Sequence, residues 1–171
     1  SKYAGFGFDA SVWEIFPYII TGASLYIIDD ETRLDIEKLN SYFNDNGITI
    51  GFLPTYIFEK FLLLENKSLR CLLTGADTLR NIKNKNYSIY NNYGPTENTV
   101  VSTSFKLSEE YGSISIGKPI DNCKIYILDE NQKIQPIGVP GELCIAGDGL
   151  ARGYLNNDEL TNQKFVNNPF D

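Results

Sequence analysis

The strongest constraint on the fold is an alternation of short apolar runs with helical patterns through the first half of the chain. Residues 23–28, 48–53 and 69–74 form continuous apolar runs bounded by Gly, Pro or Asp, which is typical of buried strands. Amphipathic patterns separate them, including a short helix expected over residues 58–64 after Pro54. Such an alternation favours an α/β fold, with a mostly parallel sheet flanked by helices.

Two further helices are expected before residue 48. The first begins at Ser11, which has capping-box spacing to Glu14, and Pro17 is expected to kink it. The second is capped by Asp35 and ends at Gly47. Each places its apolar residues on one face, toward the sheet.

The pattern changes after about Lys106, because Ser, Gly and Pro then punctuate short strands without a crossover helix. The predicted strands are residues 123–128, 133–137 and 142–146. They indicate a small antiparallel β subdomain, a meander or partial barrel, followed by a short helix capped by Asn156 or Asn157. We therefore expect an α/β part over residues 1–108 and a β-rich part over residues 109–171.

Composition excludes several function classes. The net charge is −7 with Lys and Arg scattered, so nucleic-acid binding is not expected. No apolar run has the length of a membrane span, so no membrane partner is expected. Cys71, Cys123 and Cys144 have wide spacings that fit reduced thiols in a cytoplasmic protein. The absence of His excludes Ser-His-Asp and Cys-His mechanisms and His-ligated metals.

A polar segment follows a short strand predicted over residues 87–90. It carries an aromatic ring, two amides, a hydroxyl and a carboxylate: Tyr93, Asn91, Asn92, Thr96 and Glu97. Ligands of open α/β sheets bind beyond the carboxyl ends of strands, and these groups suit base stacking, phosphate contact and cation binding through oxygen. Taken alone, the segment fits equally well an ordinary turn with Thr96 as a helix N-cap.

Three motifs together resemble the amino-acid adenylation domains of nonribosomal peptide synthetases, within the adenylate-forming superfamily. They are Phe-Asp-Ala-Ser-Val-Trp-Glu at residues 8–14, Tyr-Gly-Pro-Thr-Glu at residues 93–97, and the Gly-rich segment at residues 141–154. Their order and the sequence between them extend the resemblance over essentially the whole chain. The resemblance implies an internal fragment, a truncated adenylate-forming enzyme fold. The family's phosphate loop, ribose-binding Asp and catalytic Lys are expected outside it.

The resemblance also implies a reaction for the parent enzyme. An amino acid and ATP form aminoacyl-AMP and pyrophosphate with Mg²⁺, and the acyl group then passes to the phosphopantetheine thiol of a peptidyl carrier protein that works with a condensation domain. The fragment by itself is expected to be inactive.

Individual roles follow from the same resemblance. Asp9 is expected to bind the α-ammonium group, Thr96 to contact the α-phosphate, and Glu97 to ligate Mg²⁺, so Thr96 and Glu97 are the catalytic candidates. The nucleotide is expected at Gly75, Ala76, Asp77, Asn91, Tyr93, Gly94 and Thr96. The amino-acid pocket is expected to consist of Asp9, Ala10, Trp13, Phe52, Leu73, Gly75, Asn92, Val100 and Val101.

The predicted pocket has one acidic anchor, apolar walls and no charge for a substrate side chain, which favours an aliphatic substrate. The same residue set resembles the family's recognition pattern for leucine, so leucine is the expected substrate. Two alternatives remain. An acyl- or aryl-CoA ligase of the same superfamily is disfavoured by Asp9, since its substrates lack an ammonium group. The other is a non-catalytic interaction domain that keeps the fold and has lost the activity, and the intact Thr96 and Glu97 count against it for the parent.

Overall fold

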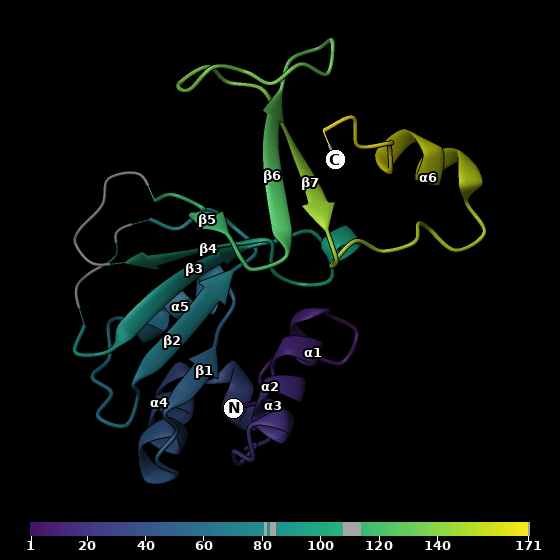
Figure 1. Cartoon of the computed structure of the whole chain (residues 1–171). Coiled ribbons are helices and arrows are strands. Elements are labelled where there is room, and N and C mark those ends of the chain that lie inside the picture. The colour runs from purple at the N-terminus through teal and green to yellow at the C-terminus, as the bar shows by residue number, and fades with distance from the viewer. Residues whose placement is uncertain (81, 83–84, 108–113, 171) are drawn as a thin grey trace.

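The computed structural model describes residues 1–80, 82, 85–107 and 114–170. A five-stranded sheet and a two-stranded sheet organise the chain (Figure 1). The helices are α1 (Ala10–Trp13), α2 (Phe16–Ile20), α3 (Asp30–Leu34), α4 (Ile36–Asp45), α5 (Thr55–Phe61), η1 (Thr96–Asn98, a 3₁₀ turn) and α6 (Asp158–Lys164). The strands are β1 (Ile50–Phe52), β2 (Cys71–Gly75), β3 (Ser88–Tyr93), β4 (Thr103–Leu107), β5 (Lys118–Pro119), β6 (Cys123–Leu128) and β7 (Glu142–Gly147).

The larger sheet has the order β1-β2-β3-β4-β5. β1, β2 and β3 run parallel, whereas β4 and β5 join in antiparallel pairs. The predicted α/β class with a mostly parallel sheet and a small antiparallel unit is therefore confirmed.

One face of the larger sheet packs on α4 and α5. Leu39 and Phe43 from α4, Phe58 and Phe61 from α5, and Leu72 from β2 are fully buried there. The Asp35 side chain accepts hydrogen bonds from the backbone N–H groups of residues 37 and 38, as an N-cap should, so the predicted α4 is confirmed. The opposite face of the sheet carries the cavity described below.

The first predicted helix is divided into α1 and α2, and its capping box is wrong. Asp9 precedes α1 without a side-chain cap bond, and Glu14 turns inward. Pro17 lies in the first turn of α2, where the missing N–H costs no intrahelical bond, so Pro17 starts a helix instead of kinking one.

The strand predicted over residues 23–28 is also wrong. Only an isolated parallel bridge between Lys2 and Ile27 forms there, and the Ile27 side chain is 71% exposed. An apolar run becomes a strand only when neighbouring strands satisfy its backbone groups, and here the partner is a single residue. The following polar residues form α3, which the sequence pattern missed; Asp29 caps it.

β6 and β7, both predicted as strands, form the two-stranded sheet and pair directly from Cys123–Gly147 to Leu128–Glu142. The predicted third strand over residues 133–137 is wrong, because it is reduced to a bridge between Ile134 and Leu128. The turn between is instead closed by Asp129, whose carboxylate accepts the N–H groups of residues 131 and 133 at 2.8 Å. In Figure 1 the β6–β7 pair stands at one end of the larger sheet with α6 beyond it.

The C-terminal helix α6 begins after Asn157, whose side chain accepts the N–H of Leu160 at 3.1 Å, as predicted. The predicted boundary at residues 108–109 lies outside the described residues; β5, further along the chain, pairs with β4 in the larger sheet. Across the described ranges, no helix is long and apolar enough to cross a membrane.

Candidate functional site

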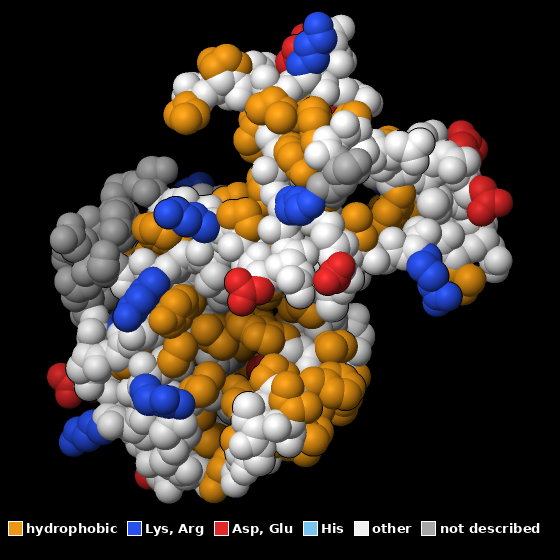
Figure 2. Space-filling view, in the orientation of Figure 1, with side chains coloured by type: hydrophobic (Ala, Val, Ile, Leu, Met, Phe, Trp, Pro, Cys, Tyr) orange, Lys and Arg blue, Asp and Glu red, His pale blue; other side chains and the backbone are white. Residues whose placement is uncertain are grey.

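A cavity of about 910 Å³ opens on the sheet face opposite α4 and α5. Figure 2 shows apolar side chains around a hollow on this face. Strand register explains its floor, because Phe52, Leu73 and Tyr90 pair across β1, β2 and β3 and form one row. Residues between them along the strands, such as Leu72, point to the helix-covered core.

Six of the nine predicted pocket residues line this cavity: Trp13, Phe52, Leu73, Asn92, Val100 and Val101. They come from α1, β1, β2, β3 and the loop before β4. The rings of Trp13 and Phe52 lie 5.5 Å apart at an interplanar angle of 60°, so α1 forms a wall over the sheet. The other three, Asp9, Ala10 and Gly75, are not among the lining residues.

Two of the predicted nucleotide residues, Asn91 and Tyr93, lie on the other face of β3. The strand extends to Tyr93, so the first half of the polar segment lies within the strand and not, as predicted, on a turn, whereas Thr96 and Glu97 follow on η1. Tyr90 and Asn92 line the cavity. Asn91 and Tyr93 alternate with them along the strand and therefore point to the opposite face of the sheet. One strand therefore presents the amino-acid candidates and the adenine candidates on opposite sides. Asn91 is 6% exposed, and its Nδ2 already donates to the Ser115 carbonyl at 2.9 Å.

Two glycines are required by close approach of the backbone. A Cβ on Gly75 would lie 2.2 Å from the carbonyl oxygen of Asn92, its register partner on β3. A Cβ on Gly94 would lie 2.3 Å from the Val100 carbonyl oxygen. Gly75 thus permits strand packing, in addition to any room it leaves for a ligand.

The turn after β2 is held by the start of α5. The Thr55 hydroxyl donates to the carbonyl oxygens of Gly75 at 3.0 Å and Asp77 at 3.3 Å. Ala76, between them, has φ of +83°, a left-handed conformation that a non-glycine residue adopts only when its surroundings impose it. The three predicted nucleotide-binding residues here therefore share a fixed backbone.

Asp9 and Thr96, although 87 residues apart, are hydrogen-bonded to each other. The Thr96 hydroxyl donates to Asp9 Oδ2 at 2.5 Å, which joins the start of α1 to η1. Pro95 occupies the N-cap position of η1, so the alternative that Thr96 is a helix cap is wrong. The candidates for ammonium and phosphate binding are adjacent.

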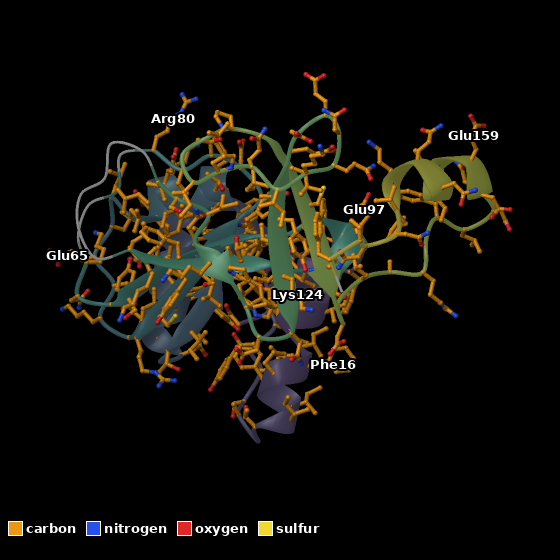
Figure 3. All side chains as sticks on the ribbon, turned by 45° about the horizontal axis from the view of Figure 1, so that its top comes forward. Phe16, Glu65, Arg80, Glu97, Lys124 and Glu159 are labelled. Atoms are coloured by element: carbon orange, nitrogen blue, oxygen red, sulfur yellow. The ribbon has the colours of Figure 1, made fainter. Side chains whose placement is uncertain are left out.

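The Glu97 carboxylate lies on the other side of η1, beside the segment that leads from β7 to α6 (Figure 3). The Tyr154 hydroxyl donates to Glu97 Oε1. This bond stabilises the charged form and lowers the pKa of Glu97, and the same bond raises the pKa of Tyr154. Glu97 thus offers a carboxylate beside a hydroxyl, and carboxylate oxygen is a donor type that Mg²⁺ accepts.

Within the described part of the chain, no group of three or more His, Cys, Asp or Glu side chains is arranged to hold a metal ion. Mg²⁺ is commonly held by one or two carboxylates together with substrate phosphates. The single Glu97 carboxylate therefore fits a metal ion that arrives with a nucleotide. The described acidic residues do not form a site that would hold a metal ion by protein groups alone.

A sequence profile described as "AMP-binding enzyme" matches residues 2–155. The chain belongs to the AMP-binding enzyme family. Among curated relatives, it is 59% identical to bacitracin synthase 1 of Bacillus licheniformis and 58% identical to surfactin synthase subunit 2 of Bacillus subtilis. Both alignments cover 99% of this chain, which spans only 3% and 5% of those proteins.

Comparison with solved structures gives the same family. The chain matches a four-domain nonribosomal peptide synthetase bound to AMP and glycine with a TM-score of 0.87 and 30% identity, over 98% of this chain and 13% of that one. It matches a synthetase protein containing adenylation and carrier-protein (PCP) domains with a TM-score of 0.85 and 28% identity, over 99% of this chain and 37% of that one. The resemblance to nonribosomal peptide synthetase adenylation domains is confirmed.

Three acidic residues that line the cavity were missed by the sequence analysis: Glu14, Asp121 and Asp148. Asp121 and Asp148 are exposed, so the prediction that the pocket offers no charge is wrong. Both belong to turns before and after the β6–β7 pair, and no local pattern links those turns to the sheet.

Glu14 is 2% exposed and anchors α1. Its carboxylate accepts the N–H groups of Tyr3 at 2.8 Å and Ala4 at 2.7 Å, and Lys2 Nζ lies 3.8 Å from Oε2. Burial raises the pKa of Glu14, while these partners oppose the rise. The capping-box spacing from Ser11 singled out Glu14 in the sequence, but it predicted a helix-capping role instead of this buried anchoring role.

Proposed function

We propose that this chain is the part of an amino-acid adenylation domain that holds the amino acid and the adenine of ATP. The parent would form aminoacyl-AMP and pyrophosphate, then transfer the acyl group to a carrier-protein thiol. The observation that carries the proposal is the cavity, since six of nine pocket residues predicted from family motifs meet there from five separate segments.

The chemistry assigned to these residues is positioning. The Asp9 carboxylate would pair with the α-ammonium group, a charge-assisted contact that fixes where the substrate carboxylate lies. A carboxylate oxygen then attacks the α-phosphorus, the P–O bond to the β-phosphate breaks, and pyrophosphate leaves with the bonding electron pair. Thr96, at 2.5 Å from Asp9, would donate to the α-phosphate and so align the two reactants.

The adenine would lie on the face of β3 that carries Asn91 and Tyr93, with the Gly75–Asp77 turn and Gly94 beside it. Tyr93 would stack on the base. Glu97 would hold Mg²⁺, whose charge offsets that of the phosphates.

We propose leucine as the amino acid. The apolar walls formed by Trp13, Phe52, Leu73, Val100 and Val101 support an aliphatic side chain. Asp121 and Asp148 are solvent-exposed and therefore pair less strongly with a buried substrate cation. A missing methylene changes selectivity by only ~1–3 kcal/mol, so weaker use of Ile, Val and Met is expected.

The test is amino-acid-dependent ATP–pyrophosphate exchange by the parent domain with each proteinogenic amino acid. We expect the highest kcat/KM with leucine. Preference for Phe or a charged amino acid would refute the leucine assignment, and exchange with fatty or aryl acids in place of amino acids would favour a CoA ligase.

Partners follow from the same proposal. A phosphopantetheine-bearing peptidyl carrier protein and a condensation domain would act with the parent in the cytoplasm, where the three free cysteines stay reduced. A solved relative that contains both adenylation and carrier-protein domains supports this pairing. The isolated chain would lack catalytic activity and retain at most an interaction role.

A further inference from the structure

The segment before α6 is bonded to η1 at three points. The Ala151 N–H donates to the Glu97 carbonyl at 2.8 Å, and the Thr99 hydroxyl donates to the Gly149 carbonyl at 2.7 Å. The third is the side-chain bond from the Tyr154 hydroxyl to Glu97 Oε1. The first two hydrogen bonds thus hold the segment against η1, and the third holds the Glu97 side chain.

Tyr154 contacts α6 and the residue that follows this helix. Its backbone N–H donates to Thr161 Oγ1 at 2.9 Å, and its ring meets the Phe165 ring edge-on at 5.6 Å. Gly153 has φ of +134°, and a Cβ there would lie 2.5 Å from Thr161 Cγ2, so the chain can turn at this point only with glycine. These contacts restrict where the phenol hydroxyl can reach.

The direction of the bond determines its effect on Glu97. The phenol donates, so it favours the ionised carboxylate and restricts its rotation about the terminal side-chain bond. A carboxylate ligand of a metal commonly depends on such an outer hydrogen bond for its orientation.

We propose that Tyr154 is a positioning residue that holds the Glu97 carboxylate in one orientation for the Mg²⁺ that accompanies ATP, an inference that rests on the proposed function. Tyr154 acts through Glu97 and does not touch the reacting atoms. The β-rich part of the chain thereby supplies a group to the site built on β3.

The test compares Tyr154→Phe with Tyr56→Phe. Tyr56 lies on α5, is 67% exposed and has a phenol bonded to Lys60, so its change removes the same hydroxyl from an unrelated surface. Circular dichroism and thermal unfolding check that both variants fold.

The first measurement is the ¹³C NMR relaxation of the Glu97 side chain in this chain, without nucleotide or metal, which reports how freely that side chain moves. Glu97→Gln assigns the signal. We expect the Glu97 side chain to become more mobile in Tyr154→Phe and to stay unchanged in Tyr56→Phe. Unchanged mobility in Tyr154→Phe would overturn the proposal.

The second measurement is the Mg²⁺ concentration that gives half-maximal pyrophosphate exchange in the parent domain. Loss of an outer-shell partner typically weakens metal affinity about 10–100-fold, and we expect an increase of that order for Tyr154→Phe only. An unchanged Mg²⁺ requirement with active enzyme would also overturn it. A wild-type parent inactive with every amino acid would instead refute the proposed function, while the NMR relaxation measurement would still decide whether Tyr154 holds Glu97.

Discussion

Replacing Glu14 with Ala is the sharpest test of how α1 is attached to the molecule. The change removes the acceptor of two buried N–H groups, those of Tyr3 and Ala4, and leaves Lys2, 6% exposed, without its carboxylate. A buried donor left unsatisfied costs about 1–3 kcal/mol, and breaking a buried ion pair costs about 3–5 kcal/mol. Since these losses overlap, we expect the free energy of unfolding to fall by about 3–5 kcal/mol.

If Glu14 acted as a helix cap, replacing it would lower the free energy of unfolding by a smaller amount. Loss of a helix cap costs about 0.5–2 kcal/mol, so the two roles of Glu14 are separable. Asp35→Ala calibrates the assay, because Asp35 is a true cap with N–H groups at 3.0 and 3.1 Å. Glu14→Gln should fall between, since its amide oxygen accepts one N–H while its amide nitrogen faces the other.

Urea unfolding at pH 7, followed by circular dichroism, measures the three variants. A loss of 3–5 kcal/mol is a large part of the total stability of a domain, about 5–15 kcal/mol. A loss for Glu14→Ala no larger than that for Asp35→Ala would refute the anchoring role.

Four further outcomes are expected. Asp9→Ala in the parent should weaken amino-acid binding by about 2–5 kcal/mol while leaving the KM for ATP nearly unchanged. Gly75→Ala should lower the unfolding free energy by about 1–3 kcal/mol in urea, because its Cβ would lie 2.2 Å from the Asn92 carbonyl oxygen. The Glu97 pKa is lowered in the folded chain, so its contribution to stability is complete above the ordinary carboxyl pKa of about 4.3 and is lost as the pH falls through the lowered value. The stability difference between wild type and Tyr154→Phe, measured in urea, should therefore shrink at acidic pH. The isolated chain should bind ATP no more tightly than roughly millimolar by calorimetry, since base stacking contributes only ~1–3 kcal/mol.

Each of these expectations can be contradicted by a specific result. Equal loss of ATP and amino-acid affinity in Asp9→Ala would mean that Asp9 supports the fold. Gly7→Ala, where an added Cβ meets nothing within 4 Å, controls for Gly75→Ala, and equal stability of both variants would contradict the packing argument. A stability difference independent of pH would exclude the Glu97 bond as its cause, and micromolar ATP affinity would mean that the chain holds a more complete site.

The sequence alone determined the features that depend on neighbouring residues. The Asp35 cap and the apolar face of α4 are encoded within one helix, and β6 and β7 are marked by short apolar runs between turn residues. The family was also readable from three motifs, since their order survives in a linear sequence. The opposite orientations of Asn91 and Asn92 were not predicted, because the strand was expected to end at residue 90 and only the structure extends β3 to Tyr93.

Tertiary structure decided which of these elements find partners. The run at residues 23–28 has strand composition but gains only one bridge, and Ile134 likewise gains only one. Glu14 fits a cap by spacing, yet the burial of α1 makes the N–H groups of residues 3 and 4 its partners. The bond between Asp9 and Thr96 spans 87 residues and that between Tyr154 and Glu97 spans 57. Local sequence records helix caps and apolar runs because those patterns lie within a few residues, whereas such distant pairs are set only when the sheet, η1 and α6 pack together.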